Sequence, residues 1–133
     1  KVALSICTKG KEYLLSRDFE KARDFFTKAL GYEPSNKESL IGLILAECSV
    51  SSSEELLEKE IAFEETGIYK YVERNGNEEV KQFFAEIKEA RIQRQEEGLR
   101  LEEEKRRLEE EEKRRLEEEE KQKQLEDAEK DKK

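Results

Sequence analysis

The chain has 133 residues, 47% of them charged, with a formal net charge of −8, two cysteines and no histidine. The acidic balance excludes a nucleic-acid-binding protein, because affinity for phosphate requires an excess of Lys and Arg, and two cysteines without histidine cannot supply the roughly four ligands that zinc needs. No run of about 18 apolar residues is present, so we expect no helix that inserts into a membrane.

The first two helices are predicted over residues 2–15 and 19–30. In the second segment the apolar side chains recur at intervals of three and four, which is the period of a helix with one buried face. Asp18 is a suitable N-cap for this helix. Gly31 is predicted to end it, with Pro34 as a further stop signal.

Two more helix starts follow from capping residues. Asn36 or Ser35 is expected to cap a third helix that runs to about Cys48. Ser52 and Glu55 have the spacing of a capping box, in which each side chain accepts a hydrogen bond from the backbone of the other residue. A further helix is therefore predicted after Ser52.

The last predicted helix begins in the domain and continues beyond it. A short helix around Ile68, Tyr69 and Val72 comes first and ends at a turn over residues 75–77. Asn77 then caps the last helix, whose apolar stripe contains Val80, Phe83, Phe84 and Ile87. The stripe stops at Ile92.

The composition changes after residue 90. Of the 43 residues from 91 to 133, 31 are charged, the same number as in the first 90. All six Phe and all four Tyr lie before residue 91, so only the first part can bury a core. We therefore expect two domains, a helical one over residues 1–90 and a charged helical arm over 91–133.

A specific pattern of small and aromatic residues runs through the first two helices. Its members are Gly10, Tyr13, Phe19, Ala22, Phe26, Ala29 and Pro34. The pattern resembles the 34-residue tetratricopeptide repeat (TPR), with Ile6 and Lys9 departing from the family's Trp and Leu. Residues 10–90 also resemble the helical segment of bacterial zinc-ribbon/TPR proteins, although the cysteine-rich ribbon is absent. The resemblance implies an all-α fold of TPR-like helical hairpins.

The resemblance also implies a binding face. In TPR proteins the first helix of each pair lines a concave surface that binds peptides, and the matching positions here are Leu4, Cys7, Lys11 and Leu14. These four are the candidate residues for contact with a protein or peptide partner. The Asn partners of a chaperone-tail clamp are missing, so that clamp is not expected. The alternative is that the four residues simply pack against later helices.

The arm contains "LEEEKRRLEEEEKRRLEEEEK" at residues 101–121. Its leucines, at positions 101, 108, 116 and 125, fill only half of a coiled-coil seam and drift around the helix. Between residues 102 and 123, seven Glu residues precede a Lys or Arg by four positions, which adds roughly 1.4–3.5 kcal/mol to a lone helix. We predict a single α-helix of about 75 Å from Glu78 to Asp127, with a soft hinge at Gly98 and a frayed end.

These features predict a non-catalytic function. No histidine, paired buried carboxylates or glycine-rich oxyanion turn is evident, so we expect no enzyme, no cofactor and no metal. The favoured function is a protein–protein interaction or scaffold module with a rigid helical spacer, either a monomer or a weak homodimer. The alternative is a structural protein that self-associates through its C-terminal helix as an elongated coiled-coil-like dimer.

The expected setting is the cytoplasm. Two unpaired cysteines are compatible with a reducing compartment. The chain begins at Lys1 without a methionine, so we expect it to be part of a longer protein.

Overall fold

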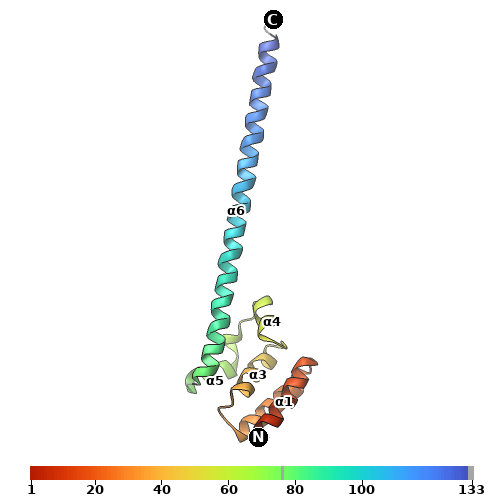
Figure 1. The fold of residues 1–133 in the computed structure, drawn as a ribbon, viewed down its shortest axis with the longest axis vertical. Coiled ribbons are helices and arrows are strands. Elements are labelled where there is room, and N and C mark those ends of the chain that lie inside the picture. The colour runs from red at the N-terminus through yellow and green to blue at the C-terminus, as the bar shows by residue number, and fades with distance from the viewer. Residues whose placement is uncertain (76, 132–133) are drawn as a thin grey trace. The chain divides into compact units, whose positions relative to one another are not determined.

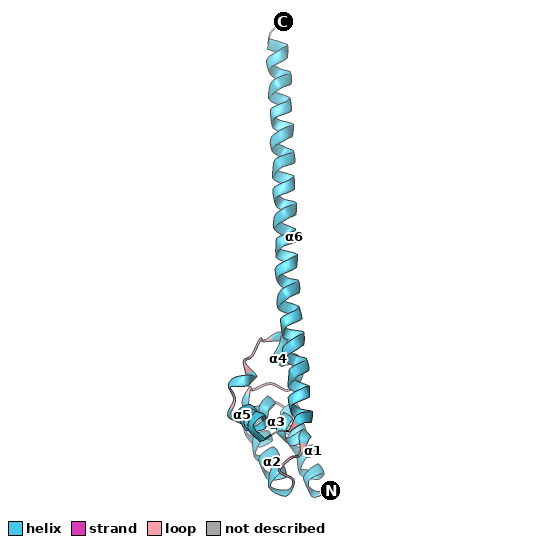
Figure 2. Ribbon diagram, turned by 90° about the vertical axis from the view of Figure 1, so that its left-hand side faces the viewer, coloured by secondary structure: helices cyan, strands magenta, loops and turns pink. Residues whose placement is uncertain are grey.

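The computed structural model describes residues 1–75 and 77–131, and every regular element in those residues is a helix. The all-α prediction is therefore confirmed. The chain divides into two compact units, Lys1–Ile92 and Gln93–Lys133, which we call the N-terminal unit and the arm. Figure 1 labels most of the helices, and Figure 2 shows helix as the only regular structure in the part of the chain that is described.

Helices α1 (Val2–Leu15), α2 (Phe19–Tyr32) and α3 (Lys37–Glu47) pack against one another (Figure 2). The predicted caps are confirmed: the Asp18 carboxylate accepts from the Lys21 N–H at 3.2 Å, and the Asn36 side chain accepts from the Ser39 N–H at 2.9 Å. The prediction that Gly31 ends α2 was wrong. The helix continues to Tyr32 and stops before Pro34, whose ring disfavours a helical residue in front of it.

The rest of the N-terminal unit comprises α4 (Ser53–Glu58), the short 3₁₀ helix η1 (Phe63–Glu65), α5 (Gly67–Asn75) and the first part of α6 (Glu78–Asp131). The predicted cap at Asn77 is confirmed, because its side chain accepts from the Val80 N–H at 3.2 Å. Of the turn predicted at residues 75–77, Gly76 lies outside the described residues.

The capping box at the start of α4 is only half formed. The Ser52 hydroxyl accepts from the Glu55 N–H at 3.3 Å, as predicted. The reciprocal bond was predicted wrongly: the Glu55 carboxylate accepts from the Ser51 N–H at 2.8 Å instead. The Glu55 carboxylate lies beside Ser51 because it also pairs with the guanidinium of Arg17, 2.9 Å away.

Phe26 is the central residue of the three-helix packing. Its ring is fully buried between Gly10 of α1 and Gly42 of α3. A Cβ atom on Gly10 would lie 2.8 Å from this ring, and one on Gly42 would lie 2.4 Å from it. Both distances are too short for a real contact. The two glycines therefore let α1 and α3 approach the same aromatic ring from two sides.

A second aromatic cluster anchors the start of α6. Phe84 is fully buried, and its ring centroid lies 5.0 Å from that of Phe63 and 5.8 Å from that of Tyr69. Arg91 lies 5.3 Å above the Phe63 ring and donates to both carboxylate oxygens of Glu64, at 3.1 and 2.7 Å. These contacts fix η1 and α5 on residues 78–92 of α6.

Three helices end in a left-handed residue that is not glycine. Arg17, Ser49 and Glu60 have φ values of 64°, 55° and 51° and follow α1, α3 and α4 respectively. Each position has the backbone hydrogen bonds of a Schellman cap, as in the Asp18 N–H donating to the Tyr13 carbonyl at 2.9 Å. The backbone hydrogen bonds hold each residue in a conformation that glycine would adopt more easily.

The arm is helical from Gln93 through Asp131, and the predicted long C-terminal helix is confirmed. Leu101, Leu108, Leu116 and Leu125 are each 52–63% exposed. None of the seven predicted Glu-to-Lys or Glu-to-Arg pairs comes within 4.0 Å, and the ion pair found between described arm residues joins Glu97 and Arg100. The helix includes Asp127–Asp131, while the last two positions of the predicted frayed end lie outside the described residues.

Candidate functional site

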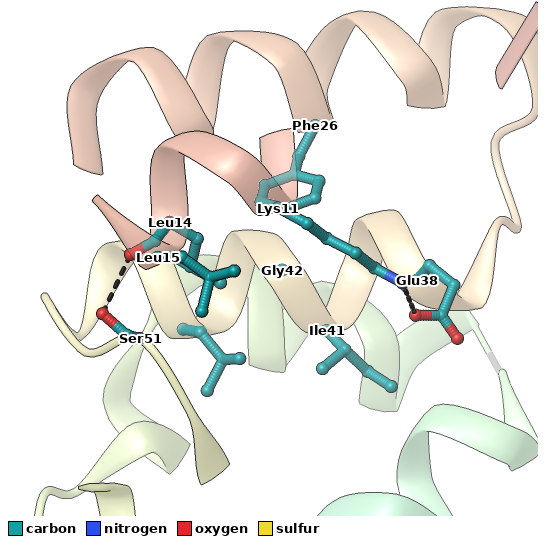
Figure 3. A pocket seen from close by; sticks show the side chains of 9 residues that line it. Lys11, Leu14, Leu15, Phe26, Glu38, Ile41, Gly42 and Ser51 are labelled. Carbon is teal, nitrogen blue, oxygen red and sulfur yellow. Dashed lines mark hydrogen bonds and ion pairs between the residues drawn. The ribbon is translucent and has the colours of Figure 1, made fainter. Parts of the chain in front are cut away.

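A hollow of about 250 Å³ opens between α1 and α3 in the N-terminal unit (Figure 3). We call it the α1–α3 hollow. Its walls are mainly apolar, with a charged pair at one end. The lining residues are Lys11, Leu14, Leu15, Phe26, Glu38, Ile41, Gly42, Leu45 and Ser51.

Helical spacing brings the walls together. Lys11, Leu14 and Leu15 stand three and four positions apart on α1, so their side chains share one face of that helix. The same spacing places Glu38, Ile41 and Leu45 on one face of α3. Because α3 is apolar on nearly all sides, it can bury one face against α1 and α2 and still present aliphatic side chains to the hollow.

The four residues predicted to contact a partner do not all reach the hollow. Lys11 and Leu14 line it. Cys7 is 1% exposed and belongs to the core, while Leu4 is 65% exposed and lies outside the lining. The structure thus brings two of the four together at one site.

Sequence reasoning missed the contribution of α3. The signal that could have found α3 was the 34-residue period of the repeat. Three of the four predicted positions, moved 34 residues along the chain, fall on three residues of the lining. Those residues are Glu38, Ile41 and Leu45. Leu15 was also missed, because the repeat pattern marked only the residue before it. Its side chain is 74% exposed and forms an accessible part of the wall.

The charged end of the hollow is an ion pair. The Lys11 ammonium lies 2.7 Å from the Glu38 carboxylate, and the dashed line between these two side chains in Figure 3 marks this contact. Both side chains are about half exposed. The hydrogen bond from Lys11 to Glu38 raises the pKa of Lys11 above its ordinary value, so Lys11 stays protonated at neutral pH. Its two charges offset each other at the rim.

The other end of the hollow is closed by a hydrogen-bonded serine. The Ser51 hydroxyl donates to the Leu14 carbonyl at 2.8 Å and accepts from Arg17 at 3.3 Å. Arg17 also donates to both oxygens of Glu55, at 3.1 and 2.9 Å, and Lys59 lies 2.7 Å from the same carboxylate. Ser51 therefore has its donor in use, and its neighbours are paired with one another.

This polar cluster predicts an acid-sensitive stability. Hydrogen bonds from Arg17 first, then from Lys59 and the Ser51 N–H, lower the pKa of Glu55 from its ordinary 4.5 to about 2. The folded state thus favours the carboxylate. The stabilisation is fully present above pH 4.5 and is lost as the pH falls from 4.5 towards 2.

The change that tests this is Glu55→Gln, with Glu54→Gln as the neighbouring exposed control. We expect thermal melts between pH 7 and pH 2 to show a smaller acid-induced drop in Tm for Glu55→Gln than for the wild type. Glu54→Gln should follow the wild-type curve. Parallel curves for Glu55→Gln and the wild type would contradict the assignment of the shift to this carboxyl group.

Burial disfavours the reactive form of both cysteine thiols. Burial raises the pKa of the Cys7 thiol, and the nearby Ser39 hydroxyl opposes that shift only in part. Burial, followed by the charges of Glu47 and Glu64, raises the pKa of Cys48 to about 11. Both sulfurs are therefore protonated at neutral pH, and the reactive form of cysteine is the thiolate.

Within residues 1–75 and 77–131, no three His, Cys, Asp or Glu side chains gather in a way that could hold a metal ion. None of the helices in the same residues combines the length and the apolar character that crossing a membrane requires. No protein-family model, no curated protein and no solved structure matches the chain.

Proposed function

We propose that the chain is a non-catalytic interaction module. The N-terminal unit docks a peptide segment of a partner protein in the α1–α3 hollow, and the arm acts as a helical spacer. The observation that carries the proposal is the continuous aliphatic lining formed by Leu14, Leu15, Ile41 and Leu45. Ligand-binding pockets are concave and mostly apolar with a few polar groups, and the hollow has each of these properties.

A TPR-like interpretation of the first three helices supports the docking role. Small residues at Gly10, Ala22 and Ala29 are buried where α1 and α2 lie against each other, and Phe26 packs between neighbouring helices. In this interpretation α1 and α3 are the first helices of two successive pairs, and their shared face is the concave one. A single complete pair followed by a divergent one would give a short groove suited to one anchoring side chain.

The docking role is tested with a pair of matched leucine variants in the full chain. Peptides are first selected from a phage-displayed random library on the wild-type protein, and their affinities are then measured for Leu15→Glu and Leu4→Glu. Both leucines are exposed on α1, but only Leu15 lines the hollow. We expect Leu15→Glu to weaken the selected peptides at least tenfold, because it places a carboxylate in an apolar wall.

Leu4→Glu should bind the same peptides as the wild type does. Recovery of no peptide whose affinity depends on Leu15 would overturn the docking role. Far-UV circular dichroism of both variants checks that neither substitution alters the fold.

The spacer role of the arm rests on its composition and exposure. The side chains of residues 93–130 are exposed, and the leucines follow one another at intervals of seven, eight and nine residues. A two-stranded seam needs apolar residues at two positions of every heptad, so this spacing does not support stable self-association. High helix propensity of Glu, Lys, Arg and Leu stabilises the arm without a partner.

The arm makes a prediction about Gly98, where no heavy atom lies within 4 Å of the position that a Cβ atom would take. We expect hydrogen exchange in the wild-type chain to be faster around Gly98 than around Leu116. Gly98→Ala should slow this exchange about fivefold, the equivalent of about 1 kcal/mol of helix propensity.

Sedimentation equilibrium of the wild type and of Gly98→Ala should give a monomer mass at every concentration. A dimer mass would count against a monomeric spacer. Hydrogen exchange at Gly98 as slow as at Leu116 would count against a locally weakened helix at Gly98.

A further inference from the structure

The polar groups around the α1–α3 hollow restrict the chemistry of its ligand. Ser51 already donates to the Leu14 carbonyl, and the wall between Ser51 and the Lys11–Glu38 pair is formed by Leu, Ile, Phe and Gly residues. A ligand group that enters the hollow therefore finds no free hydrogen-bond donor there apart from Lys11. Burying a polar group without a partner costs free energy, so the entering group has to be apolar.

The charge of Lys11 is already offset by that of Glu38. Their charged atoms are 2.7 Å apart, and Glu38 also lies in the first turn of α3, where its charge offsets the positive end of the helix dipole. A ligand carboxylate near Lys11 would be repelled by Glu38 and would have to displace it. A ligand ammonium near Glu38 would meet the same obstacle from Lys11. The Lys11–Glu38 end of the rim thus has no net charge to attract an ion.

We infer that the hollow selects a peptide segment with a large, uncharged apolar side chain and no carboxylate beside it, and that Glu38 sets this preference. This inference rests on the docking role proposed above. Because the charges of Lys11 and Glu38 offset each other, a charged ligand group gains no net attraction at this end of the hollow, whereas an uncharged group loses nothing there. Removing the charge of Glu38 leaves Lys11 unpaired at the rim and changes the preference towards anionic ligands.

A pair of small probes that differ by one charge tests the inference. N-acetyl-leucine amide and N-acetyl-leucine share the same side chain, and only the second is a carboxylate at pH 7. Each is titrated into the full chain while the NMR signals of Leu15, Ile41 and Leu45 are followed. In the wild type we expect the amide to bind about threefold more tightly than the carboxylate, within the range of exposed ion-pair effects.

Glu38→Gln should reverse the order, so that the carboxylate binds about threefold more tightly than the amide. The matched control is Glu20→Gln. Glu20 occupies the same position in the first turn of α2 as Glu38 does in α3, is exposed and does not line the hollow. The control therefore makes the same change in net charge and in helix-end charge, and it should keep the wild-type order.

The outcomes separate the two proposals. If the carboxylate binds the wild type as tightly as the amide, or if Glu38→Gln keeps the wild-type order, the role of Glu38 is overturned while the docking role stands. If neither probe shifts the signals of the hollow, the inference is overturned, whereas the docking role is decided by the peptide selection described above. Reversal in Glu38→Gln and in Glu20→Gln alike would assign the effect to net charge and overturn the inference.

Discussion

Gly42→Ala is expected to destabilise the N-terminal unit by about 3 kcal/mol, as measured by urea unfolding followed by tyrosine fluorescence. The added methyl group would lie 2.4–2.6 Å from three carbons of the Phe26 ring. That ring is fully buried and is also confined by Gly10 on its other side, so it cannot move away without disturbing α1. All four tyrosines lie in the N-terminal unit, so their fluorescence reports on this unit alone.

Two controls separate overpacking from a general effect of replacing glycine. Gly31 lies in α2, and a Cβ atom added there would have no heavy atom within 4 Å, so Gly31→Ala should be neutral or stabilise by up to about 1 kcal/mol. In a Phe26→Leu background, Gly42→Ala should cost less than about 1 kcal/mol, because the smaller side chain leaves room. An unchanged cost in that background would show that the loss does not arise from the contact with Phe26.

The contact between Phe26 and Gly42 is of a kind that sequence analysis could not predict, whereas the starts of the helices were predictable. Helix starts depend on one side chain accepting a bond from a backbone N–H two or three residues ahead, and Asp18, Asn36 and Asn77 revealed them. The fit of Phe26 against Gly42 depends on residues of different helices. Sequence analysis singled out Gly10 but not Gly42, since nothing local to Gly42 distinguishes it from any other helical glycine.

Helix ends were harder to predict than helix starts. Glycine is the usual signal for the left-handed residue after a helix, but Arg17, Ser49 and Glu60 take that conformation here. Arg17 adopts the left-handed conformation at a position from which its guanidinium reaches Glu55 and Ser51, 38 and 34 residues away. Long-range contacts of this kind are absent from any sequence window, and they fix one end of the hollow.

The hollow itself was half predictable for a similar reason. Lys11 and Leu14 followed from the pattern of a single helix pair, whereas Ile41 and Leu45 required α3 to lie beside α1. The neutralisation of Lys11 by Glu38 required it too, and that pair decides the charge at the rim. The sequence already disfavoured a carboxylate clamp at Lys11, because the Asn partners are missing. The structure adds that Glu38 pairs with this lysine.

Phe84→Ala is expected to have the second large effect, a loss of about 4 kcal/mol in the stability of the N-terminal unit. Phe84 is fully buried, and it contacts Phe63 of η1 and Tyr69 of α5 with centroid distances of 5.0 and 5.8 Å. Alanine would remove these contacts and leave a cavity between three elements. Phe83→Ala is the matched control, because Phe83 is adjacent but only partly buried, and its loss should cost about 1 kcal/mol.

The two spectroscopic signals should respond differently to Phe84→Ala. Tyrosine fluorescence should report early unfolding of the N-terminal unit, whereas far-UV circular dichroism should retain the helical signal of the arm, whose stability depends on local propensity rather than on a core. Coincident loss of both signals in this variant would show that the arm depends on the aromatic cluster for its helicity. That result would remove the basis for treating the arm as a self-supporting spacer, since a spacer must stay helical when the unit next to it unfolds.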